Sequence, residues 1–259
     1  MNLPAKKSLG QNFLVDENTS RRIVSALKTG HGDIVLEIGP GRGALTRLID
    51  EGGSRVYALE KDFALCSFIR ENFPGVDIIC ADALTFDWRR LAVIPGLKIV
   101  GNLPYNIASR LLWDMACQLR GFHRAVFMVQ KEVGQRIVSS PGSRNYGALS
   151  VWIQSFLKPE VLFKVSPMVF RPRPKVDSIV LKFAPLGYKE KKFSSRNLSR
   201  TIKILFQHRR KQVKTILRTY WNDEISSFFQ ERGLTPRSRP EELFPADFQG
   251  LSRKLFPEN

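Results

Sequence analysis

Short apolar segments alternate with segments of helical period through the first half of the chain. Five apolar segments rich in Val, Ile, Leu and aromatic residues are DIVLEIG (33–39), SRVYALE (54–60), VDIIC (76–80), LKIVGN (97–102) and RAVFMVQ (124–130). Their nearly continuous hydrophobicity is typical of parallel strands that are covered on both faces. The intervening GALTRLIDE and FALCSFIREN have the period of amphipathic helices. Repeated strand–helix units predict a doubly wound α/β sheet.

Two further apolar segments, VLFKV (161–165) and SIVLKFA (178–184), predict the strands that complete this sheet. The linker between them, SPMVFRPRPKVD, is too rich in proline to form a crossover helix. Beyond about residue 186 the sequence predicts helices without strands. We therefore expect two domains, a catalytic sheet domain over residues 1–185 and a smaller, basic helical domain over residues 186–259.

The chain is strongly basic. Its 259 residues include 41 Lys and Arg but only 24 Asp and Glu, a formal net charge of +17. Such an excess favours a polyanionic partner, either nucleic acid or an anionic membrane surface. No apolar run approaches the ~20 residues that span a bilayer, and the N-terminus lacks the apolar core of a secretory signal. We therefore expect no membrane insertion.

Cysteine and histidine are scarce and scattered. Cys66, Cys80 and Cys117 form no CxxC pair, and none of the three histidines has the spacing of a metal ligand. The simplest expectation is a reduced, cytoplasmic protein without a metal. The sequence says little about oligomeric state, and we expect a monomer.

A glycine loop directly follows the first predicted strand. Gly39, Gly41 and Gly43 in EIGPGRGA allow a sharp turn and a close approach of a ligand to the main chain. Glu60 ends the second strand, where a carboxylate can accept both ribose hydroxyls of a nucleoside, and Asp82 after the third strand can accept from an adenine amino group. The spacing also fits a dinucleotide site, so a nicotinamide dehydrogenase is an alternative. The order E-x-G-x-G-x-G resembles class I S-adenosylmethionine-dependent methyltransferases more closely.

The stretch GNLPYNI follows the fourth strand, at the edge where open α/β sheets bind ligands. The Asn102 side chain and the Leu103 backbone offer carbonyl oxygens, and Pro104 keeps Leu103 out of the α region. Tyr105 offers a face on which a flipped base can stack. Acceptors aimed at the hydrogens of an exocyclic amine favour a pyramidal nitrogen whose lone pair can attack a methyl group. A turn with a core tyrosine is the structural alternative.

Six motifs, in this order, resemble the ribosomal RNA adenine dimethyltransferases of the small-subunit type. They are SLGQNFL, LEIGPGRGALT, GNLPYNI, VFRPRPKVDS, FQHRRKQ and RPEELFPADF, and they span nearly the whole chain. The resemblance implies a Rossmann-like seven-stranded sheet with an antiparallel last strand, a small helical domain, and S-adenosylmethionine as cofactor. It also implies dimethylation of two adjacent adenines near the 3′ end of small-subunit rRNA, in the ribosomal subunit or its pre-30S precursor, with a role in subunit biogenesis.

The same resemblance assigns the site residues. It implies that the cofactor is bound by Gln11, Asn12, Leu14, Gly39, Gly41, Glu60, Asp82 and Asn102. Asn102 and the backbone of Leu103 and Pro104 would face the target amine. Tyr105 would stack on the adenine, and Phe170 would cover its other face.

Seven basic residues near aromatic side chains are candidates for RNA contact: Arg171, Arg173, Lys175, Arg209, Arg210, Lys211 and Lys214. Contacts of this kind to phosphates supply affinity and register, and an adenine in a hairpin loop is a natural target. A large-subunit adenine methyltransferase of the antibiotic-resistance type is one alternative, which the C-terminal motifs disfavour. A non-catalytic RNA-binding assembly or transcription factor is another, which the intact glycines and Asn102 disfavour.

Overall fold

The computed structural model of the protein describes residues 3–119, 121–187 and 193–257. The chain divides into two compact units. The first unit contains residues 1–134 and 158–185, and the second contains residues 135–157 and 186–259. The expected boundary near residue 186 is therefore incomplete, because residues 135–157 group with the second unit.

The first unit contains a seven-stranded sheet. Its strands are β2 (Ile34–Ile38), β3 (Arg55–Glu60), β4 (Asp77–Cys80), β5 (Lys98–Asn102), β6 (Arg124–Gln130), β7 (Leu157–Val165) and β9 (Ser178–Pro185), in the order β4-β3-β2-β5-β6-β9-β7. Strands β2 to β6 pair in parallel, and β9 runs antiparallel to β6. Each strand overlaps a predicted apolar segment, so the predicted sheet is confirmed. The strand order reverses between β2 and β5, the position at which such sheets bind ligands.

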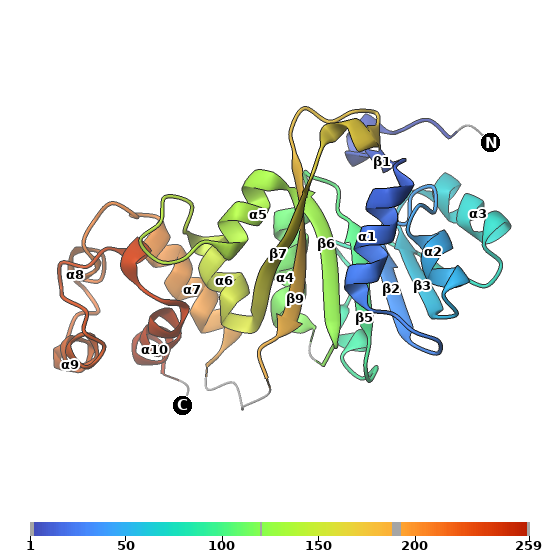
Figure 1. Cartoon of the computed structure of the whole chain (residues 1–259). Coiled ribbons are helices and arrows are strands. Elements are labelled where there is room, and N and C mark those ends of the chain that lie inside the picture. The colour runs from blue at the N-terminus through green and yellow to red at the C-terminus, as the bar shows by residue number, and fades with distance from the viewer. Residues whose placement is uncertain (1–2, 120, 188–192, 258–259) are drawn as a thin grey trace. The chain divides into compact units, whose positions relative to one another are not determined.

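The helices of this unit follow the predicted strand–helix repeats. They are α1 (Glu17–Leu27), α2 (Thr46–Glu51), α3 (Phe63–Asn72) and α4 (Ala108–Gln118), with a 3₁₀ turn η2 (Trp88–Leu91). Helix α5 (Lys131–Val138) follows β6, and the division between the two units falls within it, after residue 134. Helix α1 begins where Asp16 accepts a hydrogen bond from the Thr19 N–H at 2.7 Å. It lies across the front of the sheet in Figure 1, and its Ile23 and Leu27 are fully buried in the core.

The N-terminal residues form a strap, which we define as residues 6–14. It contains a 3₁₀ turn η1 (Lys7–Leu9) and a short strand β1 (Phe13–Leu14). Strand β1 pairs antiparallel with β8 (Phe170–Arg171), in the proline-rich linker between β7 and β9. The longest helical piece in that linker is the 3₁₀ turn η3 (Pro167–Val169), as its proline content predicted. The pairing joins the N-terminus to a segment more than 150 residues away.

Apart from Leu157, where β7 begins, the regular elements of the second unit within its described residues are helices. Its helices are α6 (Ala148–Phe156), α7 (Ser195–Phe206), α8 (Val213–Ile216), α9 (Asp223–Glu231) and α10 (Pro245–Leu255), with a 3₁₀ turn η4 (Pro240–Glu242). Helix α6 packs against α7 and α10. Its sequence, ALSVWIQSF, is apolar nearly all round, so it must be covered on several sides. This explains why residues 135–157 join the second unit. The expected boundary segment after residue 185 includes residues 188–192, which lie outside the described residues.

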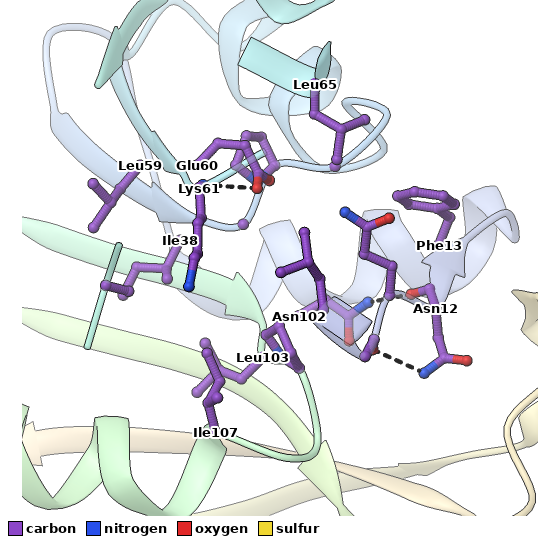
Figure 2. A pocket seen from close by; sticks show the side chains of 18 of the residues that line it. Asn12, Phe13, Ile38, Leu59, Glu60, Lys61, Leu65, Asn102, Leu103 and Ile107 are labelled. Carbon is purple, nitrogen blue, oxygen red and sulfur yellow. Dashed lines mark hydrogen bonds between the residues drawn. The ribbon is translucent and has the colours of Figure 1, made fainter. Parts of the chain in front are cut away.

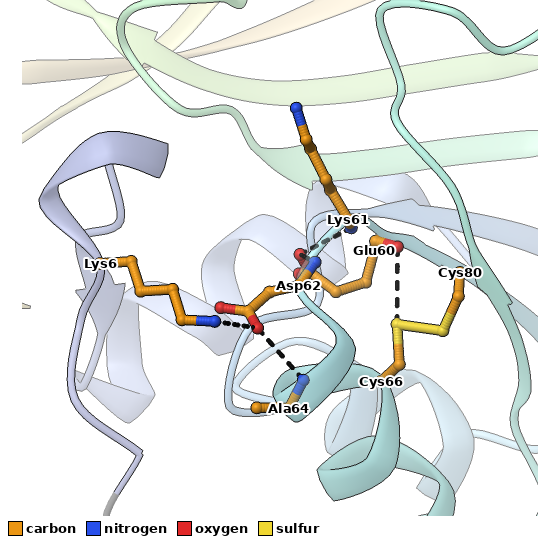
Figure 3. The surroundings of a disulfide bond; sticks show 7 residues. All are labelled: Lys6, Glu60, Lys61, Asp62, Ala64, Cys66 and Cys80. Atoms are coloured by element: carbon orange, nitrogen blue, oxygen red, sulfur yellow. Dashed lines mark hydrogen bonds and ion pairs between the residues drawn. A yellow bond between two sulfur atoms is a disulfide. The ribbon is translucent and has the colours of Figure 1, made fainter.

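A disulfide corrects the expectation of reduced cysteines. Cys66 of α3 and Cys80 at the end of β4 are bonded, with a Cα–Cα distance of 6.2 Å (Figure 3). The β3–β4 register places Cys80 beside Glu60, and α3 begins three residues after Glu60. Pairing of the two strands thus brings together cysteines 14 residues apart, a spacing with no recognisable sequence signal. Cys117 keeps its thiol.

Within the described residues, no helix is both long enough and apolar enough to cross a membrane. The same residues contain no group of three or more His, Cys, Asp or Glu side chains that could hold a metal ion.

Candidate active site

A cavity lies at the carboxyl edge of the sheet, where the strand order reverses (Figure 2). Its walls come from the strap, the loop after β2, the end of β3 and the loops after β4 and β5. All eight predicted cofactor residues line it: Gln11, Asn12, Leu14, Gly39, Gly41, Glu60, Asp82 and Asn102. Leu103, Pro104 and Tyr105 line it too, so five separate chain segments bring the predicted nucleoside and amine groups to one cavity.

The loop after β2 requires glycine at defined positions. Gly41 has φ +57°, and a Cβ there would lie 3.1 Å from Cδ1 of Phe13 in the strap. Gly43 has φ +80°, and a Cβ there would overlap the Phe73 ring. Because L side chains rarely adopt such φ values, any other residue strains the turn. The turn therefore lets the strap pack against the main chain beside the cavity.

The Glu60 carboxylate is held by the backbone that follows it. Its Oε1 accepts hydrogen bonds from the N–H groups of Lys61 at 2.8 Å and Asp62 at 2.9 Å. The residue is only 9% exposed, and this burial raises the pKa of Glu60 above its usual range while the two N–H groups oppose the shift. A carboxylate offers about four acceptor sites. Glu60 can therefore accept ribose hydroxyls in addition to its backbone partners.

A second carboxylate, Glu37 in β2, also lines the cavity. It begins the order E-x-G-x-G-x-G, but it was assigned no role in binding from the sequence. It is fully buried, accepts a hydrogen bond from Oγ1 of Thr46 at 2.6 Å, and has a pKa raised by burial to about 7. The available signal was an acid in the otherwise apolar strand VLEIG. A carboxyl group so poised becomes ionised readily when a cation lies near it.

Asp82 already has protein partners. Its Oδ2 pairs with Nζ of Lys61 at 2.8 Å, and its Oδ1 accepts from the Leu84 N–H at 2.9 Å. The Lys61 ammonium is the main reason that the pKa of Asp82 lies below its usual range. Asp82 is thus an ionised acceptor at the cavity wall, and Lys61 is a second lining residue that sequence reasoning missed.

The backbone and side chain of GNLPY present two acceptors. Nδ2 of Asn102 donates to the backbone carbonyl of Asn12 at 3.0 Å, which leaves its Oδ1 as the other end of an oriented amide. The Leu103 N–H donates to the Met128 carbonyl at 3.1 Å. Among the described residues, no group donates to Oδ1 of Asn102 or to the Leu103 carbonyl.

The Pro104 carbonyl has a different use. It accepts hydrogen bonds from the N–H groups of Ile107 at 3.1 Å and Ala108 at 3.0 Å, where α4 begins. A carbonyl oxygen has two lone pairs, so both are occupied. Of the two predicted backbone acceptors, Leu103 is therefore the available one.

The two predicted aromatic contacts differ. Tyr105 is half-buried in the cavity wall, and its hydroxyl lies 2.5 Å from Oγ of Ser178. Burial raises the pKa of Tyr105, so the phenol stays neutral at ordinary pH. Phe170 is fully buried in the core with Leu14 and Val165, and it is absent from the cavity lining. The structure thus brings Tyr105 to the site and leaves Phe170 behind the wall, where β8 pairs with β1.

The seven residues predicted to contact RNA differ in their exposure to solvent. Six are exposed: Arg171, Arg173 and Lys175 in the first unit, and Arg210, Lys211 and Lys214 in the second. Arg209 is partly buried, pairs through Nε with Glu241 at 2.6 Å, and donates through Nη2 to the Arg144 carbonyl at 2.9 Å. Arg209 is therefore committed to contacts within its own unit.

The strand order, the antiparallel last strand and the glycine loop with its acids define a class I S-adenosylmethionine-dependent methyltransferase. A sequence model of the family described as ribosomal RNA adenine dimethylase matches residues 2–254. The chain belongs to this family, and its enzyme class is that of the S-adenosylmethionine-dependent rRNA adenine dimethyltransferases. A nicotinamide dehydrogenase is no longer an alternative.

Individual relatives agree with this assignment. The chain is 51% identical, over 256 residues, to the ribosomal RNA small subunit methyltransferase A of Oleidesulfovibrio alaskensis, covering 97% of this chain and 91% of that protein. A dimethyladenosine transferase from Plasmodium falciparum matches with a TM-score of 0.74 and 23% identity, covering 94% of this chain and 95% of that one. The 23S rRNA methyltransferase ErmE matches with a TM-score of 0.71 and 23% identity, covering 94% and 99%. The two structural matches show the fold alone.

Proposed function

We propose that this enzyme transfers methyl groups from S-adenosylmethionine to N6 of two adjacent adenines in a hairpin loop near the 3′ end of small-subunit rRNA, and dimethylates both. One observation carries the proposal: Oδ1 of Asn102 and the Leu103 carbonyl are unengaged acceptors in the cavity that also holds the cofactor residues. The choice of subunit is supported by the name of the 51% identical relative and by the motifs FQHRRKQ and RPEELFPADF.

The cavity residues suit the three parts of S-adenosylmethionine. Glu60 would accept the ribose hydroxyls, and Asp82 would accept from the adenine amino group. The buried Glu37 carboxyl would hold the cationic amino group, because a nearby cation favours its ionised form. The bound cofactor supplies an electrophilic methyl group. The main chain at Gly39 and Gly41 can approach it closely because neither residue has a side chain.

The acceptors of GNLPY act on the amine of the target. The lone pair of an adenine amino group is delocalised into the ring, which makes the nitrogen a poor nucleophile. Oδ1 of Asn102 and the Leu103 carbonyl would each accept a hydrogen bond from one N–H of the amine. These two bonds favour a pyramidal nitrogen and require no strong base. Pro104 contributes by restricting the backbone of Leu103, since its own carbonyl is used by α4.

Aromatic groups would hold the base. Tyr105 lines the cavity and offers a ring for stacking, with its hydroxyl anchored on Ser178. Phe170 would act from the core by supporting β1 and the strap through the Leu14–Phe170 pairing. This replaces its expected direct contact with the base.

The exposed cations would bind the phosphates of the rRNA, in the first unit through Arg171, Arg173 and Lys175 and in the second through Arg210, Lys211 and Lys214. The substrate would be the small ribosomal subunit or its pre-30S precursor. The enzyme would then act as a monomer in the cytoplasm, with a role in subunit biogenesis.

Transfer of tritiated methyl groups to small subunits that lack the modification tests the proposal. We expect dimethyladenosine in the hydrolysed nucleosides and primer-extension stops at two adjacent adenines of the small-subunit rRNA. Large subunits in the same assay serve as the control. Stops on the large-subunit rRNA alone would contradict the proposal and favour the antibiotic-resistance type.

A further inference from the structure

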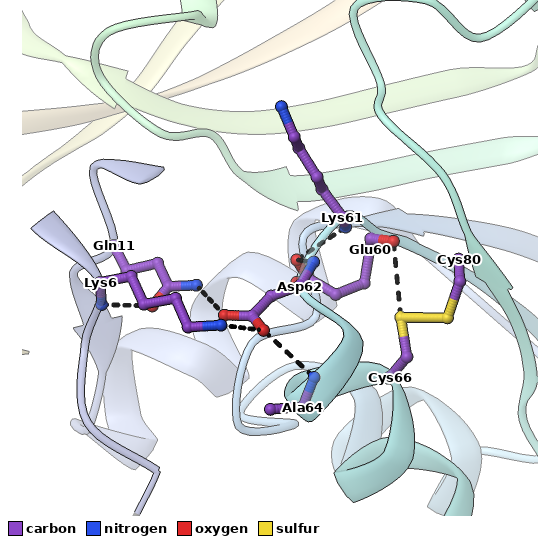
Figure 4. Close-up of polar contacts among 8 residues, drawn as sticks. All are labelled: Lys6, Gln11, Glu60, Lys61, Asp62, Ala64, Cys66 and Cys80. Atoms are coloured by element: carbon purple, nitrogen blue, oxygen red, sulfur yellow. Dashed lines mark hydrogen bonds and ion pairs between the residues drawn. A yellow bond between two sulfur atoms is a disulfide. The ribbon is translucent and has the colours of Figure 1, made fainter. Parts of the chain in front are cut away.

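The strap is fastened at Asp62, a residue without a role in the reaction described so far (Figure 4). The Asp62 side chain is only 3% exposed, and its Oδ1 pairs with Nζ of Lys6 at 2.6 Å. Its Oδ2 accepts from Nε2 of Gln11 at 3.0 Å. Oδ1 also accepts from the Ala64 N–H at 3.1 Å, which caps α3. One buried carboxylate therefore ties two strap residues to the start of α3.

Both ends of the Gln11 amide are engaged. Nε2 donates to Asp62, and Oε1 accepts from the Lys6 N–H at 2.8 Å. A reversed amide would place a donor against the Lys6 N–H and an acceptor against the carboxylate. Gln11 is therefore locked in one orientation, and Lys6 and Gln11 form the two ends of a closed loop. Although Gln11 lines the cavity, its polar atoms serve the strap.

The strap is fastened a second time at Asn102. The residue after Gln11, Asn12, accepts Nδ2 of Asn102 on its backbone carbonyl at 3.0 Å. This bond fixes the Asn102 amide with its Nδ2 toward the strap and leaves its Oδ1 as the free acceptor. Because Gln11 and Asn12 are adjacent, a shift of Gln11 moves the carbonyl that orients Asn102. The two fastenings lie near the ends of different strands, since Asp62 follows β3 and Asn102 ends β5.

We propose that Asp62 is a positioning residue, which holds the strap over the cofactor through Lys6 and Gln11 and thereby keeps the Asn102 amide in its productive orientation. The inference rests on the proposed function, because it assigns the cavity to S-adenosylmethionine and Asn102 to the amine. It adds that cofactor binding and amine orientation depend on one carboxylate, which is not part of the cavity lining.

Exchange of the donor and acceptor between residues 62 and 11 tests this proposal. Asp62→Asn keeps the cap of α3, because Asn and Asp are equally good N-caps. It turns Nδ2 of the new side chain toward Nε2 of Gln11, donor against donor. Gln11→Glu alone places a carboxylate against the Asp62 carboxylate. The double variant restores a donor facing an acceptor.

Each single variant should weaken S-adenosylmethionine binding about tenfold, as expected for one hydrogen bond to a charged group. Each should also lower kcat at saturating cofactor, since Asn102 loses its fixed partner. The double variant should recover both quantities to within about threefold of the wild type. Calorimetry gives the dissociation constant, and tritiated methyl transfer to unmodified small subunits gives kcat.

Glu160→Gln, which removes the surface ion pair between Glu160 on β7 and Lys182 on β9, is the matched control and should change neither quantity. Single variants that match the wild type, or a double variant as weak as the product of the singles, would overturn the positioning role. Failure of the wild-type protein to bind S-adenosylmethionine or to methylate small subunits would instead contradict the proposed function. A purely structural effect would lower the melting temperature of the cofactor-free protein in step with the affinity, whereas we expect shifts below about 3 °C.

Discussion

The cavity and the cationic surface of the second unit use polar groups in opposite ways. At the cavity Asn102, Asp82 and Tyr105 each have a hydrogen-bond partner that sets the direction of the side chain. In the second unit Arg210 and Lys211 are exposed to solvent. The difference follows from what each region must recognise. An amine that is to become pyramidal needs acceptors at fixed points, whereas a phosphate backbone needs positive charge.

Removal of the Asn102 side chain should have the largest effect, and it tests whether the cavity depends on acceptors held at fixed positions. Asn102→Ala deletes one of the two acceptors for the amine, and we expect methyl transfer to fall about 10²–10³-fold, as for loss of one preorganised group. Filter binding should show unchanged affinity for the rRNA. Asn18→Ala, at an exposed position of α1, is the control. Equal loss of RNA affinity and activity in Asn102→Ala would contradict the assigned role.

A pH titration of cofactor binding tests the buried carboxyl of Glu37. Its pKa of about 7 means that the group must lose a proton to pair with a cation, and an α-amino group stays protonated below that pH. The dissociation constant for S-adenosylmethionine should therefore rise about tenfold for each pH unit below 7. Glu37→Gln should bind more weakly and lack this dependence, while Glu51→Gln on the exposed side of α2 should keep it.

The stability of the cofactor-free protein should respond to Glu37 with the opposite sign. Because burial raises the pKa from 4.5 to about 7, the folded state keeps a proton that the unfolded state has lost between these values. The contribution of Glu37 to stability is thus largest below pH 4.5 and falls as the pH rises to about 7. Denaturant titrations of the wild type and Glu37→Gln across this range would show it. A difference that does not vary with pH would count against the raised pKa.

The salt dependence of RNA affinity tests whether the exposed cations of the second unit bind phosphates. Replacement of Arg210, Lys211 and Lys214 by Ala should make the slope of log K against log salt shallower by about two, if each contacts one phosphate of a single strand. Between 50 and 200 mM salt the wild type should then lose about 16-fold more affinity than the triple variant. Arg209→Ala should differ, lowering the melting temperature because Glu241 loses its partner. An unchanged slope in the triple variant would remove this surface from RNA binding.

The smallest expected effect concerns the disulfide between Cys66 and Cys80, which lies next to Glu60, and a count of free thiols tests it. Titration of the unfolded, unreduced protein should find one thiol, from Cys117, because Cys66 and Cys80 are bonded. After reduction it should find three. Three thiols before reduction would show that the bond is absent from the protein as isolated.

Much of the fold was predictable because strands and turns depend on neighbouring residues. Apolar runs located all seven strands of the main sheet, and the glycine loop had to turn where Gly41 and Gly43 adopt positive φ. The place of α6 was not predictable in this way. A helix that is apolar all round signals burial, but only its contacts with α7 and α10 show which unit it joins.

The amino-acid sequence by itself determined the sheet, the family and the eight predicted cofactor residues that line the cavity, since these follow from short motifs in a fixed order. Only the tertiary structure decided how those residues are held. The hydrogen bond from Gln11 to Asp62 joins positions 51 residues apart, and the one from Asn102 to Asn12 joins positions 90 residues apart. Phe170 is buried where β8 pairs with the strap. Arg209 is held within its own unit by its ion pair with Glu241. Contacts between residues so far apart in the sequence arise from the packing of the whole chain, so no local sequence pattern predicts them.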